Sequence, residues 1–240
     1  CYHGGMELAY NWFPPYSYNL ALFVFISGYF YKTDYEENIG KYIWKRTKRL
    51  LIPAYLWNIF YGGMVAFLGL FGFTIGAKPD LYNLFVMPFV DGEAFQYNLG
   101  SWFVYPLFLV CIINVLFRKF LKLIHLDNEF IVLIVYLAIG MIGINTAIGN
   151  PTAINGIVKL LVRTMFFLPC YEFGRFYKAV LEKKDTLNNV AYFAIIFAVQ
   201  LILLTFCKDL EYTPSSFTKF NNGFIIPYIS SITAIAFWLR

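Results

Sequence analysis

The residue best suited to acid–base chemistry is His3, which precedes the first apolar run and is followed by Glu7 one helical turn later. An imidazole with a pKa near about 6.5 can take a proton from a hydroxyl, or carry an acyl group, at neutral pH. His3 is therefore a candidate catalytic base, with Glu7 beside it as a candidate substrate-binding residue. The alternative is an exposed histidine near the start of the chain.

A basic cluster, Lys45-Arg46-Thr47-Lys48-Arg49, lies between the first two apolar runs. Guanidinium groups bind phosphate with two parallel hydrogen bonds, and the amides of a helix N-terminus also favour anions. Lys45, Arg46 and Arg49 are therefore candidate phosphate ligands. Alternatively, the cluster anchors the chain at the membrane surface or binds anionic lipid, as juxtamembrane Lys and Arg residues commonly do.

Two charged residues, Lys159 and Arg163, lie four positions apart inside the fifth apolar run, on one face of a helix. Charges inside a membrane span are costly and usually face a cavity or a partner. A cavity role is favoured for Arg163, whereas Lys159 could simply extend to the membrane interface. Trp102 could belong to an interfacial aromatic belt. Ser27 and Gly28 could form a helix-packing patch or a narrow passage for a ligand.

The composition indicates an integral membrane protein. The chain of 240 residues is 60% hydrophobic and 14% charged, whereas soluble domains carry about 25% charged residues. The 21% of aromatic residues fit interfacial belts. The net charge of +5 resides in loops between apolar runs, which indicates membrane topology and argues against nucleic-acid binding.

Apolar runs long enough to cross a bilayer predict an all-α polytopic protein with about seven transmembrane helices. They cover residues 17–32, 50–73, 100–117, 130–149, 153–177, 188–207 and 222–240. Lys and Arg are concentrated in loops 32–49, 118–129 and 174–187, so the positive-inside rule places these loops in the cytoplasm and residues 1–16 outside.

Metal chemistry is not expected. The four cysteines are scattered without a CxxC pair, and the two histidines fall on opposite sides of the predicted membrane. Phosphate-binding glycine loops, nucleophile elbows and HExxH motifs are absent from the sequence.

Four stretches together resemble the membrane-bound acyltransferase type 3 family, which O-acylates surface polysaccharides and other glycans. FVFISGYF (23–30) resembles the family's FFxxSGF/Y run, and RTKRLLIP (46–53) resembles its RxxRLxxP segment. GSWFVYPLF (100–108) resembles its WFL segment, and RTMFFLPCYEFGR (163–175) resembles its arginine-containing FFxxGyxxG helix. Cys170 departs from the family pattern, which often has glycine there.

The resemblance implies a transferase that moves an acetyl group from cytoplasmic acetyl-CoA to a hydroxyl of an extracytoplasmic glycan or polysaccharide, in the plasma membrane and without a metal. It implies that Arg46, Arg49 and Lys45 bind the CoA phosphates, and that Ser27 and Gly28 pass the thioester arm. His3 would be the base or acyl carrier.

The same resemblance implies that Arg163 stabilises the oxyanion or binds an anionic acceptor, with Glu7, Trp102 and Lys159 near the substrate. Family members have about ten helices, and the arginine that precedes the family's histidine by eleven positions would fall before Cys1. We therefore expect residues 1–240 to form a single acyltransferase domain, incomplete at both ends and lacking the first helix.

Two other functions remain open at this point. A transporter or flippase for a glycan or lipid-linked sugar would use Arg163 and Lys159 to bind substrate in a cavity, although no inverted repeat is visible in the sequence. A non-catalytic subunit of a polysaccharide synthase would bind no CoA. Consumption of acetyl-CoA distinguishes the acyltransferase from both alternatives.

Overall fold

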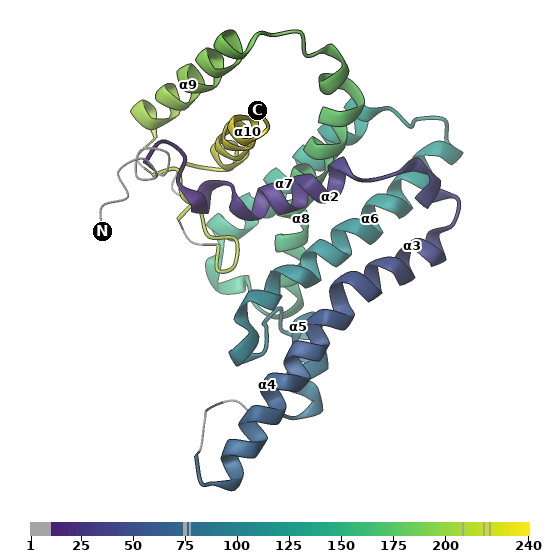
Figure 1. Cartoon of the computed structure of the whole chain (residues 1–240), viewed down its shortest axis with the longest axis vertical. Coiled ribbons are helices and arrows are strands. Elements are labelled where there is room, and N and C mark those ends of the chain that lie inside the picture. The colour runs from purple at the N-terminus through teal and green to yellow at the C-terminus, as the bar shows by residue number, and fades with distance from the viewer. Residues whose placement is uncertain (1–10, 74–75, 77, 208, 218, 221) are drawn as a thin grey trace. The chain divides into compact units, whose positions relative to one another are not determined.

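The computed structural model describes residues 11–73, 76, 78–207, 209–217, 219–220 and 222–240. Its regular structure is helical, and no β-strand occurs among these residues (Figure 1). The all-α prediction is therefore confirmed. The chain forms two compact units, each described by itself: unit 1 comprises Cys1–Tyr31, Asn128–Pro151 and Met165–Arg240, and unit 2 comprises Lys32–Asp127 and Thr152–Thr164.

Unit 2 contains a long helical run beside a second long helix (Figure 1). Its elements are η2 (Thr33–Glu36), α3 (Ile39–Arg46), η3 (Thr47–Leu51), α4 (Ile52–Leu70), η4 (Tyr82–Val86), α5 (Met87–Val90), η5 (Gln96–Phe103) and α6 (Val104–Leu123). After η6 (Pro151–Ala153), α8 (Gly156–Phe176) contributes its first nine residues to unit 2 and the rest to unit 1.

The helical run Ile39–Leu70 is continuous but contains a π-helical turn over Thr47–Leu51. Pro53 explains this turn, because proline has no N–H to donate and its ring crowds the carbonyl four residues earlier. A π turn over Tyr82–Val86 likewise precedes Pro88. The basic cluster therefore lies inside a helical run, and not at a helix start with free amides as the sequence suggested.

The core of unit 2 joins α6 to η3 and to the start of α8. It is built from Leu51, Tyr105, Phe108 and Leu160, with Ile43 and Phe89 among the half-buried residues packed against it. This core packs the part of the run around Ile43 and Leu51 against α6, so that the basic cluster is held on a rigid element.

Unit 1 is helical as well. Its elements are η1 (Pro15–Ser17), α2 (Asn19–Tyr29), α7 (Glu129–Gly149), the second part of α8, η7 (Tyr177–Leu181), η8 (Glu182–Lys184), α9 (Asn189–Phe206) and α10 (Ile226–Trp238). One core cluster is formed by Phe13, Tyr18, Ile196 and Ala234.

Within unit 1, α2 and α8 approach each other backbone to backbone at two glycines. A Cβ at Gly28 would lie 1.8 Å from the carbonyl oxygen of Tyr171, and a Cβ at Gly174 would lie 1.9 Å from that of Phe25. Small residues permit such close contact between membrane helices. The two glycines therefore set the distance between α2 and α8.

The chain has four helical runs that are long and apolar enough to cross a membrane: Ile39–Leu70, Gln96–Leu123, Glu129–Gly149 and Asn189–Phe206. They support the assignment as a membrane protein. The apolar helices α2 and α10 have only 11 and 13 residues, whereas a span needs roughly 20. α8 has 21 residues but carries charges along its length. The predicted total of seven spans stays a prediction.

Candidate functional site

The residues predicted from the sequence fall in different parts of the molecule. Unit 2 holds two groups of them. One is the basic cluster with Lys45, Arg46 and Arg49, and the other is formed by Trp102 of η5 with Lys159 and Arg163 near the start of α8. Ser27 and Gly28 belong to unit 1. His3 and Glu7 lie outside the described residues.

The basic cluster is arranged by contacts with aromatic rings of unit 2. The Arg46 guanidinium lies 5.2 Å from the ring centre of Tyr42, and its Nε donates a hydrogen bond to the Tyr42 hydroxyl at 3.1 Å. The Lys48 Nζ lies 5.1 Å from the ring centre of Trp44. Both are pairs four residues apart on one helix, the spacing at which side chains meet. Cation–ring contacts of this kind restrain the side chains while the charge stays accessible.

A polar cavity of about 210 Å³ lies beside this cluster. It is lined by Asp34, Tyr35, Asn38, Lys41, Tyr42 and Lys45. The rings of Tyr35 and Tyr42 are stacked at 4.6 Å between centres with an angle of 27°. The Lys45 Nζ lies 5.3 Å from the ring centre of Tyr35. Ammonium groups next to stacked rings are suited to a ligand that carries both phosphate and a planar ring.

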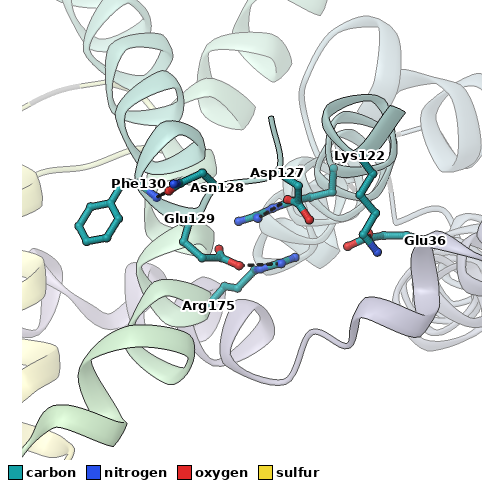
Figure 2. Close-up of polar contacts among 8 residues, drawn as sticks. Glu36, Lys122, Asp127, Asn128, Glu129, Phe130 and Arg175 are labelled. Carbon is teal, nitrogen blue, oxygen red and sulfur yellow. Dashed lines mark hydrogen bonds and ion pairs between the residues drawn. The ribbon is translucent and has the colours of Figure 1, made fainter. Parts of the chain in front are cut away.

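Two ion pairs, each with one buried partner, lie in the segments next to this cavity. Glu36 of η2 is almost fully buried, and its carboxylate pairs with Lys122 Nζ at 2.7 Å near the end of α6 (Figure 2). Arg118, also in α6, is fully buried and donates to Asp127 at 3.0 Å. Breaking a buried pair leaves an uncompensated charge, which is strongly destabilising. The Glu36–Lys122 pair therefore holds η2, and with it Tyr35 and Asp34, against α6, whereas the Arg118–Asp127 pair holds the loop that follows α6.

A second group in unit 2 surrounds Arg163. Its guanidinium lies 4.6 Å from the ring centre of Trp102, and its Nη1 donates a hydrogen bond to the carbonyl of Gly92. Arg163 is only 2% exposed. The structure thus brings Arg163 and Trp102 together, but it covers the guanidinium with the chain at Gly92.

The turn at Gly92 depends on glycine. Its φ is +65°, and a Cβ there would lie 2.9 Å from the carbonyl oxygen of Gly156 at the start of α8. The next residue, Glu93, forms an ion pair with Lys159. Lys159 and Arg163 are one turn apart in α8. Their contacts with Glu93 and Gly92 therefore attach residues 92–93 to one face of this helix. We call Gly92, Glu93, Trp102, Lys159 and Arg163 the Arg163 cluster.

Ser27 and Gly28 take part in helix packing in unit 1. The Ser27 hydroxyl donates to the carbonyl of Phe23 in its own helix at 3.1 Å, and Gly28 allows the close approach to Tyr171. These contacts agree with the packing alternative considered from the sequence. A role of these two residues in passing a thioester remains a prediction.

The other charged contact of note in unit 1 joins α7 to α8. Arg175 Nη2 donates to Glu129 at 2.9 Å (Figure 2), and its guanidinium lies 4.9 Å from the ring centre of Tyr31. Asn128 caps α7 by accepting from the amide of Phe130 at 2.9 Å. Arg175 therefore ties the end of α8 to the start of α7 and to the end of α2.

Sequence reasoning missed the aromatic part of the candidate site. Tyr35, Lys41 and Tyr42 line the polar cavity, and no motif marked them. The pairs Tyr42/Arg46 and Trp44/Lys48 could have been found, because ring and cation are four residues apart within a helix. Gly92 could have been suspected only as a turn residue in the sequence Asp91-Gly92.

The described part of the chain has no group of three or more His, Cys, Asp or Glu side chains that could hold a metal ion. The polar groups at the basic cluster are mainly cationic and are suited to binding anions, whereas the cations of the Arg163 cluster are already bound to Gly92 and Glu93.

Comparison with known proteins identifies the family. A family model described as an acyltransferase domain matches residues 2–240, and the chain therefore belongs to this family, acyltransferase type 3. Searches of curated proteins and of solved structures gave no significant match. The chain is thus a membrane protein with an acyltransferase domain.

Proposed function

We propose that this protein transfers an acetyl group from cytoplasmic acetyl-CoA to a hydroxyl group of an extracytoplasmic glycan, in the plasma membrane. Membership of the acyltransferase family supports acyl transfer in general. What we propose beyond family membership is that acetyl-CoA is the donor, that a glycan is the acceptor, and that transfer runs from the cytoplasm outward.

The observation that carries the proposal is the polar cavity of unit 2. CoA carries a nucleotide ring together with several phosphates, and the cavity offers stacked tyrosines together with Lys41 and Lys45. Arg46 and the exposed Arg49 follow within one helical turn and supply two more cations. We assign Lys45, Arg46 and Arg49 to the phosphates and the Tyr35 ring, which stacks on the buried Tyr42, to the base.

Topology supports this assignment. The positive-inside rule puts the basic segment 32–49 in the cytoplasm, where acetyl-CoA is made. It puts residues 1–16, with His3 and Glu7, on the outer side, where a glycan acceptor would be. The acetyl group then crosses the membrane, and the path past Ser27 and Gly28 is part of the same proposal.

His3 is the proposed general base. It takes the proton of the glycan hydroxyl, whose oxygen forms the new C–O bond to the acetyl carbon while the C–S bond of the thioester breaks. The proton then passes to the leaving thiolate, which gives CoA as the free thiol. Alternatively, His3 first takes the acetyl group as a transient acyl-histidine and then passes it to the glycan hydroxyl, which gives the same products.

We assign Arg163 a positioning role. In the described conformation its guanidinium is covered by Gly92 and stacked on Trp102, so it holds residues 92–93 on α8. Contact of Arg163 with an oxyanion or an acceptor, as the resemblance implies, would require this turn to move away. Lys159 and Trp102 are retained as candidate acceptor-binding residues.

The test measures transfer of labelled acetyl from acetyl-CoA to glycan in inside-out vesicles that contain the full-length protein. His3→Ala should lower the rate by about 10²–10⁴-fold, the usual contribution of a general base. Lys45→Ala should raise the KM for acetyl-CoA about fivefold with little change in kcat, because it removes binding that is equal in ground and transition states.

Lys48→Ala is the matched control, since Lys48 lies on the same helical run but contacts Trp44 and does not line the cavity. Equal effects of Lys45→Ala and Lys48→Ala on KM would show that net charge, and not the cavity, attracts CoA. Folded wild-type protein that neither binds CoA nor consumes acetyl-CoA would overturn the proposal and favour the transporter.

A further inference from the structure

Unit 1 contains a cavity larger than the polar one and of opposite character. Its volume is about 350 Å³. It is a partly open pocket, lined by the end of α8, the segment that follows α8, the start of α9 and the end of α10, with Phe25 of α2 adding to the wall. The acyltransferase proposal assigns no role to it.

The wall of this cavity is apolar apart from one end. Phe173 and Phe176 of α8 line it together with Ile232 and Ile235 of α10. The charged lining residues are Lys184 and Asp185, which are neighbours in the chain. The cavity therefore has an apolar body and a charged rim.

The rim carries a net positive charge. The Asp185 carboxylate is held by Arg240 Nη2 at 2.6 Å, and Arg240 in turn donates to the carbonyl of Leu187 at 2.9 Å and lies 4.2 Å from the ring centre of Tyr192. Lys184 is exposed, and no ion pair of Lys184 was found with the residues that the structure describes. Its ammonium is thus available to an anion at the rim.

The size of the cavity is suited to one hydrocarbon chain. An engineered apolar cavity of about 150 Å³ stays dry and binds benzene, which has six carbons, so a cavity of 350 Å³ accommodates roughly a dozen carbons. Because α9 is an apolar candidate span with little of its surface buried, the cavity lies in a helix group that contacts lipid. Lipid tails are the hydrocarbon available there.

We propose that this cavity binds an anionic phospholipid, with one acyl chain in the apolar body and the phosphate next to Lys184. The segment that bears the rim, 174–187, is basic and is predicted to be cytoplasmic. Anionic lipids are concentrated in the cytoplasmic leaflet and attract basic juxtamembrane segments. The bound lipid would hold α8, the start of α9 and the end of α10 together.

The experiment uses the full-length protein in nanodiscs of phosphatidylcholine that contain a trace of phosphatidylglycerol with a photoreactive group in its acyl chain. Cross-linked peptides are mapped by mass spectrometry. Cross-links are expected at the walls of α8 and α10, on Phe173, Ile232 or Ile235. Photoreactive phosphatidylcholine should label these walls about fivefold less, as one lysine near the surface contributes about that factor.

Two matched pairs of variants test the body and the rim separately. Ala236→Phe fills the cavity and should reduce labelling of the walls at least fivefold, whereas Ala194→Phe, on an exposed face of α9, should not. Lys184→Ala should remove the preference for phosphatidylglycerol, whereas the adjacent and equally exposed Lys183→Ala should retain it. Lys184 is exposed, so this variant tests the rim even if Ala236→Phe fails to fold.

Equal labelling of Ala236→Phe and wild type would overturn the proposal. So would equal labelling by the two lipids in the wild type. Displacement of the photoreactive lipid by micromolar palmitoyl-CoA would also overturn it, since the cavity would then take the chain of an acyl donor. These outcomes are independent of acetyl transfer, so the lipid site and the acyltransferase proposal fail separately.

Discussion

Arg46 and Arg163 each place a guanidinium over an aromatic ring, at 5.2 and 4.6 Å from the ring centre, but their surroundings differ. The ring under Arg46 is Tyr42, four residues earlier in the same helical run. The ring under Arg163 is that of Trp102. Arg163 also donates a hydrogen bond to Gly92, which is 71 residues away in the chain. One contact is local and the other joins distant segments.

This difference indicates that the Arg46 side chain can bind a ligand, whereas the Arg163 side chain stabilises the fold. Arg46 is half-buried and stands beside a polar cavity, so its charge can still reach a phosphate. Arg163 is buried, and its charge satisfies a main-chain carbonyl. Changes at Arg163 should therefore act on stability, and changes at Arg46 should act on binding of acetyl-CoA.

The largest effect is expected for Arg163→Ala, which removes the donor to the Gly92 carbonyl and the contact with Trp102. The free energy of unfolding should fall by about 2–4 kcal/mol, as for other buried charged groups whose partner is lost. Thermal unfolding in nanodiscs measures this. Lys159→Ala is the control and should cost less, because Glu93 is half-exposed in the Lys159 pair.

Arg163→Lys should recover only part of the lost stability, since an ammonium cannot stack flat on Trp102 while it donates to Gly92. A stability of Arg163→Ala equal to that of the wild type would contradict the structural role of this arginine.

The next effect is expected for Gly92→Ala. Alanine would have to adopt φ +65° with its Cβ 2.9 Å from the Gly156 carbonyl oxygen, so we expect a loss of about 1–3 kcal/mol in the free energy of unfolding. The matched control is Gly100→Ala, because a Cβ at Gly100 meets nothing within 4 Å and its φ is not positive. Equal unfolding temperatures of the two variants would show that the turn at Gly92 is not held against α8.

A change at Arg46 should have its main effect on binding. Arg46→Ala should alter the unfolding temperature little, because the residue is half-buried and its contact with Tyr42 lies within one helical run. It should weaken the binding of acetyl-CoA about tenfold if a charge-assisted contact with phosphate is lost. Isothermal titration calorimetry measures the affinity. Loss of stability without loss of affinity would reverse the distinction between Arg46 and Arg163.

The smallest effect is expected for Tyr42→Phe, which keeps the ring that stacks on Tyr35 and removes the hydroxyl that accepts from Arg46. We expect about 0.5–1 kcal/mol or less in stability, as for one partly exposed hydrogen bond. Tyr42→Ala removes the ring as well and should weaken acetyl-CoA binding further than Tyr42→Phe does. Equal affinities of these two variants would exclude the ring from the donor site.

Sequence reasoning was successful where the signal is local. Apolar runs predicted helices at α4, α6, α7 and α9, because a backbone inside lipid must satisfy its own hydrogen bonds. The spacing of Lys159 and Arg163 placed both on one face of α8, and Trp102 was selected as a possible partner of a substrate. The structure brings Arg163 and Trp102 together, but it also covers Arg163.

The remaining features of the candidate sites depend on contacts between distant segments. The polar cavity needs Tyr35 and Asp34 of η2 to meet Lys41 and Lys45 of the helical run. The position of η2 is fixed by the ion pair between Glu36 and Lys122. Neither the cavity nor the ion pair can be read from spacing along the chain.

The sequence by itself determined that this is a helical membrane protein, where its apolar helices lie, and which acyltransferase family it resembles. These properties follow from hydrophobic length, loop charge and short motifs, which are all local. Only the tertiary structure decided that Arg163 is buried and bonded to Gly92, that Tyr35 and Tyr42 stack beside Lys45, and that unit 1 contains an apolar, partly open cavity. The reason is that burial and cavities are produced by side chains from separate segments, whose meeting depends on how the helices pack.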